Sequence, residues 1–328
     1  MANNNEQFKA FHDVIKMTSA KKETLRTNRD ALRSRIRNYF KKNHSDYIQP
    51  KFCWQGSFAM DTILNPIKDE DGLGAYDLDD GIYFISNDIT DRKDLEWYHN
   101  EVYKAVNGHT DQAPKDNDPC VTVNYADGHH VDLPTYFMIE DETPQLSHRK
   151  TPWLESDPKG LREWFNEECR QKQNLKRMVR YLKAWCDYYN SETGKKMPTG
   201  CILTMLAAEH YVVVAEENRE DVQMKDILVK MYDSLSAENG FHCNRPTAPY
   251  DDLFDGYSIK RKNDFLGELK AFKEDAERAI NSKNPRDACA KWQKHFGPRF
   301  SCSTAKDEDE DAQQKTFAGV IKNESRYA

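Results

Sequence analysis

The chain has 328 residues, of which 38% are hydrophobic and 31% charged, and its formal net charge is −7 at pH 7. These values describe a folded protein with a sizeable core, and the acidic balance argues against a broadly basic surface that coats nucleic acid. No apolar run reaches membrane-spanning length and the first residues lack the layout of a signal peptide, so we expect a cytoplasmic protein without membrane contact. The eight cysteines are scattered without a CxxC pair, which favours free buried thiols.

The first half of the chain combines helix and strand signals. Apolar residues at helical spacing predict helices over 5–17, 20–43 and 91–108. β-rich or apolar runs predict strands over 81–86, 119–126 and 129–138. The last two runs flank Ala126-Asp127-Gly128, which is typical of a hairpin turn.

From Asp157-Pro158 onward the pattern becomes helical, because Asp is a good N-cap and Pro suits the first helical position. Helices are predicted over 159–190, 199–216, 221–237, 258–281 and 285–297. We therefore expect an α+β protein with a mixed domain at 1–150 and a helical domain at 151–302. The acidic, apolar-poor segment 303–328 is expected to be a flexible tail.

The stretch from 54 to 84 carries candidate metal ligands. Asp77 and Asp79 are two residues apart, and on a strand both carboxylates point to the same face. Two close carboxylates repel one another unless a cation such as Mg²⁺ neutralises them. Asp132 lies in a later apolar run, where an unpaired acid is costly. The sequence therefore predicts a metal site made by Asp77, Asp79 and Asp132.

A glycine and a hydroxyl residue precede these acids. If Gly56-Ser57 opens a helix, its backbone N–H groups and hydroxyl can hold a phosphate. Nucleotidyl transfer needs such donors, together with a metal pair at the attacking hydroxyl and the leaving pyrophosphate. The combination predicts a nucleotidyltransferase. The alternative is a calcium-like or merely acidic loop, since residues 69–71 and Asp80 add further acids.

Several segments resemble a known family. QGSFAMDT, AYDLDDGIYF and HHVDLPTY are similar to the core motifs of the bacterial cGAS/DncV-like nucleotidyltransferases (CD-NTases), and SDPKGLREWFNEECRQ and RYLKAWCDYY resemble the helical region of the DncV type. The similarity covers most of residues 35–215. It implies a polymerase-β-like nucleotidyltransferase palm, with a mixed sheet and a long N-terminal helix, and a C-terminal helical domain that closes the active-site cleft.

The resemblance also implies an activity and its cofactor. The family makes cyclic oligonucleotides from nucleoside triphosphates as signals in CBASS anti-phage defence, so we expect a cyclic di- or trinucleotide made from ATP and GTP. Asp77, Asp79 and Asp132 match the residues that bind two Mg²⁺ ions, with Mn²⁺ as the alternative ion. A downstream effector activated by the product is implied as a partner, and no stable nucleic-acid partner is expected.

Other residues match nucleotide-binding positions of the family. Gln55, with Gly56 and Ser57, matches the motif that holds the triphosphate. Met60 stands where DncV-type enzymes can place a base-stacking Tyr, so the choice of base is left open.

In the second half, Lys183 matches a Lys that contacts nucleotide phosphate. Thr199 stands where the family often has Ser and could keep one hydroxyl near the phosphates. On a helical wheel Lys183 shares a basic stripe away from the apolar face with Lys172, Lys176 and Arg180.

Three alternatives stay open. The first is an enzyme that makes linear products, such as an oligoadenylate synthase or a tRNA-end nucleotidyltransferase, and the second is a catalytically silent scaffold that binds nucleotide. The third concerns the C-terminus: in some systems of the family a ubiquitin-like conjugation machinery attaches the synthase C-terminus to a target. A tail ending in Arg326-Tyr327-Ala328 would be accessible to it, and a plain flexible end is the other interpretation.

Overall fold

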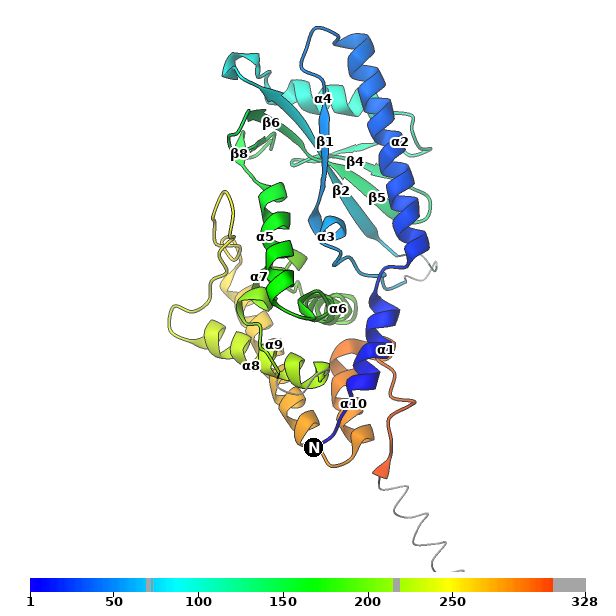
Figure 1. Cartoon of the computed structure of the whole chain (residues 1–328), viewed down its shortest axis with the longest axis vertical. Helices are drawn as coiled ribbons and strands as arrows, with labels where there is room; N and C mark the ends of the chain where they lie inside the picture. Colours follow the sequence, from blue (N-terminus) through cyan, green and yellow to red (C-terminus); the bar gives the residue numbers. More distant parts are fainter. Residues whose placement is uncertain (69–71, 73, 215–218, 309–328) are drawn as a thin grey trace, which may run out of the picture. The chain divides into compact units, whose positions relative to one another are not determined.

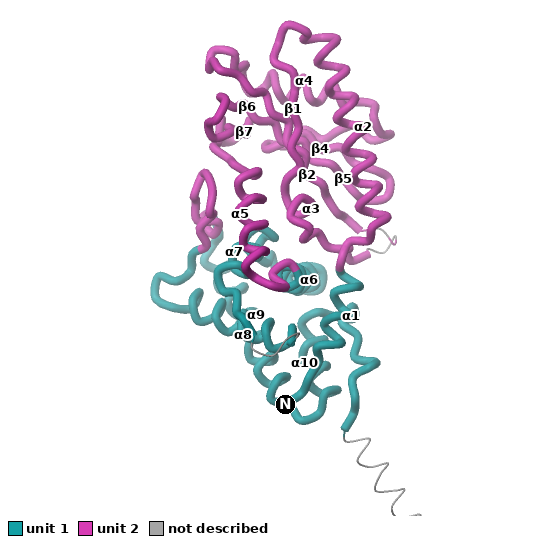
Figure 2. The backbone as a smooth tube through the Cα atoms, in the orientation of Figure 1, with its two compact units in different colours: residues 1–15, 177–242, 256–328 teal, residues 16–176, 243–255 magenta. Residues whose placement is uncertain are grey.

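The computed structural model describes residues 1–68, 72, 74–214 and 219–308. The chain divides into two compact units (Figure 2), of which the first contains Met1–Ile15, Arg177–His242 and Gly256–Ala328 and the second contains Lys16–Lys176 and Cys243–Asp255. The domain boundaries predicted after residues 150 and 302 stay predictions. Most of the predicted tail, including its last three residues, lies outside the described part of the chain.

The second unit contains a mixed β-sheet with β2 as its organising strand (Figure 1). The strands are β1 Lys51–Gln55, β2 Tyr76–Ser86, β3 Lys115–Asp116, β4 Val121–Asn124, β5 His129–Leu133, β6 Thr135–Ile139, β7 Gln145–Leu146 and β8 Leu154–Glu155. Their order is β3-β4-β5-β2-β6-β7-β8, and β1 pairs with β2 off this path. Since β2 is antiparallel to β1 and parallel to β5 and β6, the sheet is mixed, as the α+β prediction requires.

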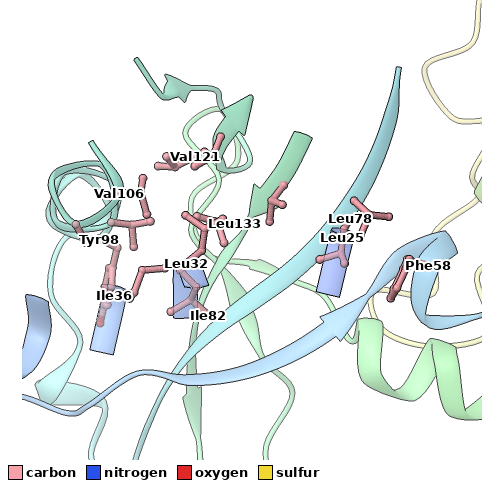
Figure 3. Packing of buried hydrophobic residues seen from close by; sticks show 14 of the residues in the cluster. Leu25, Leu32, Ile36, Phe58, Leu78, Ile82, Tyr98, Val106, Val121 and Leu133 are labelled. Atoms are coloured by element: carbon pink, nitrogen blue, oxygen red, sulfur yellow. The ribbon is translucent and has the colours of Figure 1, made fainter. Parts of the chain in front are cut away.

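The described residues of this unit form four α-helices, α2 Ser19–Asn43, α3 Gly56–Ala59, α4 Leu95–Val106 and α5 Pro158–Gln171, and a short 3-10 helix at Ile89–Asp91. Two leucines and one isoleucine of α2 pack with α4 and with one face of the sheet, and Figure 3 shows Leu32 and Ile36 beside Tyr98 and Ile82. On β2 the even-numbered residue Leu78 is fully buried in the same cluster. Because strand side chains alternate, the odd-numbered residues of β2 point to the opposite face of the sheet.

The described part of the first unit is helical, with α1 Asn5–Ile15, most of α6 Leu175–Thr193, α7 Gly200–Glu209, α8 Glu220–Ser236, α9 Ile259–Asn281 and α10 Pro285–Phe296. Aromatic rings from four of these helices form its core: Phe8 contacts Trp292, and Phe272 contacts both Trp292 and Trp185. Among the described helices, none combines the length and the apolarity that crossing a bilayer requires.

Local expectations were met in part. The hairpin predicted around Ala126-Asp127-Gly128 is the antiparallel pair β4–β5, but its second strand stops at Pro134 and resumes as β6. The single helix predicted over 159–190 is wrong: it is two helices, and Asn174 between them adopts a left-handed backbone with φ of 64°.

Two further expectations were wrong. The basic stripe does not form, because Lys172 lies beyond the end of α5 and Arg180 is only 3% exposed, donating a 2.9 Å hydrogen bond to His12 Nε2. The cysteines are not all free, since Cys289 on α10 forms a disulfide with Cys302. Helix α10 and the turn after it bring the two Cα atoms to 5.7 Å, a proximity that linear spacing does not reveal.

Candidate active site

Three side chains on β2 and β5 converge on one point. The two strands are parallel, and their register places Asp77 opposite His130 and Asp79 opposite Asp132. Residues two apart on a strand share a face, so all four side chains emerge on the same side of the sheet. Each of Asp77, His130 and Asp132 offers one ligand atom, and these three atoms lie within 4.8 Å of one another. This is close enough for all three to hold one metal ion.

Asp79 lies against the backbone of Gly56. Strand β1 pairs Gln55 with Asp79, and at Gly56 the chain turns into α3 with φ of 67°. A Cβ atom added at Gly56 would lie 1.9 Å from Asp79 Oδ2, so no other residue fits there without displacing the carboxylate. The glycine of the Gly-Ser motif and the second acid of the Asp-Leu-Asp motif are therefore packed directly together, and Ser57 follows in the first turn of α3.

Hydrogen bonds orient the carboxylate of Asp132. Thr122 faces Asp132 across the β4–β5 pair, and its hydroxyl donates a 2.5 Å hydrogen bond to Asp132 Oδ1. Asn117 Nδ2 in turn donates to Thr122 Oγ1 at 2.9 Å. The hydroxyl hydrogen of Thr122 is therefore the one that it donates to Asp132. The other oxygen, Asp132 Oδ2, lies 3.6 Å from His130 Nε2. One oxygen of Asp132 is thus held by protein and the other is directed to the cluster.

The electrostatics of the cluster favour a cation. Burial raises the pKa of the Asp132 carboxyl, and although the hydrogen bond from Thr122 and the nearby His130 lower it, the charge of Asp77 adds to the rise and leaves the pKa above its ordinary value. Burial and then the charge of Asp132 raise the pKa of the Cys120 thiol to about 12. A divalent cation would stabilise the charged form of these carboxylates, so the donor set fits the divalent metal expected from the sequence.

Asp80 is not part of this cluster, because it points to the opposite face of β2. Its carboxylate is fully buried and forms a two-pronged ion pair with Arg33 of α2, at 2.6 Å from Nε and 2.5 Å from Nη2. Burial raises the pKa of this carboxyl, against the effect of the guanidinium. Asp80 therefore anchors α2 to the sheet, and residues 69–71, the other acids behind the acidic-loop interpretation, lie outside the described residues.

Two predicted nucleotide-binding residues of the second unit have buried side chains. Gln55 Nε2 donates to the Tyr136 hydroxyl at 3.0 Å, and Gln55 Oε1 accepts a 3.5 Å hydrogen bond from Tyr83. These contacts tie its amide to the sheet. Met60 is 6% exposed at the end of α3. Their predicted contacts with nucleotide stay predictions.

The two remaining candidates lie together in the first unit. Thr199 is the N-cap residue of α7, and its side chain makes no capping hydrogen bond. Gly200 follows it, and a Cβ atom added there would lie 3.0 Å from Lys183 Cε. The lysine of α6 therefore runs along the first turn of α7, where partly unpaired N–H groups favour an anion.

Sequence reasoning missed His130 and Thr122. His130 could have been found, because it lies two residues before Asp132 on a predicted strand and so shares its face. Thr122 could not, because its contact with Asp132 depends on the register of the β4–β5 hairpin.

A mixed sheet with acids on neighbouring strands beside a Gly-Ser turn is the arrangement expected of a nucleotidyltransferase domain. The family model described as "Cyclic GMP-AMP synthase DncV-like, nucleotidyltransferase domain" matches residues 50–136, which include the cluster and the Gly-Ser turn. Residues 50–136 therefore match a DncV-like nucleotidyltransferase domain, as the motifs predicted.

Two curated relatives agree with this assignment. A cyclic GMP-AMP synthase from Escherichia albertii is 26% identical over 180 residues, which cover 52% of this chain and 39% of the relative. A c-di-GMP synthase from Roseivirga ehrenbergii is 25% identical over 231 residues, covering 61% of this chain and 59% of the relative. The chain thus spans less than two thirds of the length of either relative.

Solved structures agree on the fold. Vibrio cholerae DncV cyclic AMP-GMP synthase in complex with nonhydrolyzable GTP superposes with a TM-score of 0.75 at 19% identity, covering 92% of this chain and 97% of that one. The same enzyme in complex with the linear intermediate pppA(3′,5′)pG gives a TM-score of 0.72 at 20% identity, covering 88% of this chain and 93% of that one.

Proposed function

We propose that this protein is a cyclic oligonucleotide synthase that makes a cyclic di- or trinucleotide from nucleoside triphosphates, with ATP and GTP as the expected substrates. The cluster of Asp77, His130 and Asp132 beside Asp79 and the Gly-Ser turn carries this proposal. Relatives named as cyclic GMP-AMP and c-di-GMP synthases, and DncV structures that hold nucleotides, support it.

Divalent metal ions, two Mg²⁺ with Mn²⁺ as the alternative, would be held by Asp77, Asp79 and Asp132 and would supply charge for the attacking hydroxyl and the leaving pyrophosphate. Asp132 accepts the proton of that hydroxyl, and Thr122 keeps the acid in one orientation while it does so.

Four residues are proposed to contact phosphate. The hydroxyl of Ser57 and the backbone at Gly56 bind the triphosphate, and Lys183 and Thr199 are retained as predicted phosphate contacts. Gln55 stays a predicted nucleotide-binding residue and also supports the Gly-Ser turn through its bonds to the sheet, and Met60 is expected beside the base.

Two chemical steps complete a cyclic dinucleotide, and a cyclic trinucleotide needs one further transfer before the ring closes. A ribose hydroxyl of one nucleotide attacks the α-phosphorus of a second triphosphate, which forms a phosphodiester and releases pyrophosphate. The remaining triphosphate is attacked in the same way by a hydroxyl at the other end, which closes the ring and releases a second pyrophosphate.

The biological setting is part of the proposal. The product would act in CBASS anti-phage signalling by activating a downstream effector in the cytoplasm. The acidic tail from residue 303 would be available to a ubiquitin-like conjugation machinery. We keep the predicted division into a nucleotidyltransferase core, a helical domain and a tail, and we expect truncated proteins to follow these boundaries.

One incubation tests the activity. The protein is mixed with labelled ATP, GTP, CTP and UTP and Mg²⁺, the products are treated with phosphatase, and the resistant material is identified by mass spectrometry. A cyclic product survives because it has no terminal phosphate, whereas linear oligonucleotides lose theirs. Linear products alone would support the linear-transferase alternative, and no product would support a silent scaffold. A variant carrying Asp77→Ala and Asp79→Ala is the control and must make no product.

A further inference from the structure

Two adjacent histidines begin β5, and their surroundings differ sharply. His129 is 2% exposed, with Nδ1 on the carboxylate of Asp127 and Nε2 at 2.9 Å from Asn28 Nδ2, so both of its nitrogens are engaged by the fold. His130 points to the other face, its side chain is 29% exposed, and its Nε2 is directed to Asp132. The first histidine is structural, and the second belongs to the candidate active site.

The position of His130 follows from strand register. It lies two residues before Asp132 on β5 and directly opposite Asp77 on β2. Its ligand atom lies within 4.8 Å of one carboxylate oxygen of each acid. The 3.6 Å between Nε2 and Asp132 Oδ2 exceeds hydrogen-bond length, and atoms at such separations can share a cation bound to each at about 2.0–2.2 Å.

We propose that His130 supplies a nitrogen ligand to the ion bound by Asp77 and Asp132. This inference rests on the proposed function, and it deepens the metal requirement of that site. Thr122 and Asn117 support the arrangement, because they hold Asp132 Oδ1 and leave Oδ2 directed to the histidine.

A nitrogen ligand changes which ion the site prefers. Mg²⁺ prefers oxygen ligands and loses its bound water reluctantly, whereas imidazole is a good ligand for transition metals. A site of two carboxylates and one imidazole therefore binds Mn²⁺ over Mg²⁺ by a larger factor than carboxylates alone. Mn²⁺ is thus expected to be the tighter-binding ion of this protein, while Mg²⁺ at higher concentration occupies the same ligands.

Pulsed electron paramagnetic resonance of Mn²⁺ bound to the full chain tests this directly. A coordinated imidazole gives a ¹⁴N coupling to the Mn²⁺ electron spin, which is replaced by a ¹⁵N coupling when the protein is made with ¹⁵N-histidine. We expect the coupling in the unaltered protein and in His242→Gln, whose exposed histidine lies in the first unit. We expect it to be absent in His130→Gln. Absence of the coupling in the unaltered protein would refute the proposal, whatever the variants do.

Titration calorimetry with MnCl₂ and with MgCl₂ supplies the second readout. His130→Gln should weaken Mn²⁺ binding by about 10-fold or more and Mg²⁺ binding by less than about 3-fold. An equal loss of affinity for both ions would mean that His130 only orients Asp132, and it would overturn the proposal that His130 is a metal ligand. Neither measurement needs turnover, so a protein that binds Mn²⁺ through His130 but makes no product would contradict the proposed function and leave this inference standing.

Discussion

Asp79 and Gly56 touch across the β1–β2 pair so closely that a Cβ atom at position 56 would lie 1.9 Å from Asp79 Oδ2. Two motifs separated by more than twenty residues therefore form one structural unit, in which the turn proposed to hold phosphate is packed against an acid of the candidate metal site. The contact explains why glycine is required there on two grounds, the close approach and the φ of 67°.

We expect Gly56→Ala to lower the rate of product formation by about 100-fold, because displacing a reacting group by about 1 Å has that order of effect. Steady-state kinetics with ATP and GTP measures it. Gly256→Ala is the matched control: Gly256 has φ of 79° with open space around it, so it carries the same backbone strain without the collision. Similar losses in both variants would show that backbone strain, and not the contact with Asp79, is responsible.

Thr122 allows a test of how Asp132 is oriented. Thr122→Val keeps the shape of the side chain but removes the hydrogen bond to Asp132 Oδ1, and it should lower kcat by about 10-fold, in the range found for groups that orient metal ligands. Thr122→Ser retains the hydroxyl and should keep most of the activity. Mn²⁺ affinity measured on both variants should follow the same order. A Thr122→Val enzyme with unchanged kcat and metal affinity would show that Asp132 needs no such support.

Alternation along strands made much of the site predictable from sequence. Two acids at i and i+2 had to share a face of β2, and a lone acid in an apolar run, Asp132, lies next to them once β5 pairs with β2. The buried Leu78 between the two acids confirms the direction of the core face.

What the sequence did not reveal depends on long-range pairing. That Asp77 meets His130 follows from the β2–β5 register, which closes a loop of some fifty residues and has no local signal. Arg180 was placed in a basic stripe away from the apolar face, because a helical wheel carries no information on the neighbouring α1. There His12 accepts a hydrogen bond from the buried Arg180. Asp80 looked like one more loop acid because its partner Arg33 lies on α2.

Neutralising Asp80 and neutralising Asp77, both on β2, should have different effects: the first on stability and the second on activity. Asp80→Asn leaves the guanidinium of Arg33 without its buried counter-ion and should lower the free energy of unfolding by about 3–5 kcal/mol. Asp77→Asn removes a ligand of the candidate metal site, so it should abolish product formation. It also removes a charge that opposes ionisation of Asp132, so it should not lower stability. Urea unfolding followed by circular dichroism compares the two variants. A stable Asp80→Asn protein would mean that the ion pair adds nothing to the fold.

The first unit offers a prediction for acid stability. Asp275 is buried on α9, where Arg278 donates to Oδ1 at 2.7 Å and Lys294 and His295 donate to Oδ2 at 2.8 and 2.9 Å. Burial alone would raise the pKa of this carboxyl, but these three partners outweigh it and hold the pKa well below its ordinary value of 3.8.

A carboxyl with a lowered folded pKa stabilises the protein fully above its unfolded pKa and loses that effect as the pH falls toward the folded value. The unaltered protein should therefore lose stability steadily below about pH 4. Asp275→Asn should be less stable at neutral pH, by about 3 kcal/mol, because three cationic or polar donors lose their charged acceptor. Its stability should also fall less steeply with acid. Urea midpoints measured between neutral pH and the acid limit test both points; parallel curves for the two proteins would mean that other carboxylates control acid unfolding.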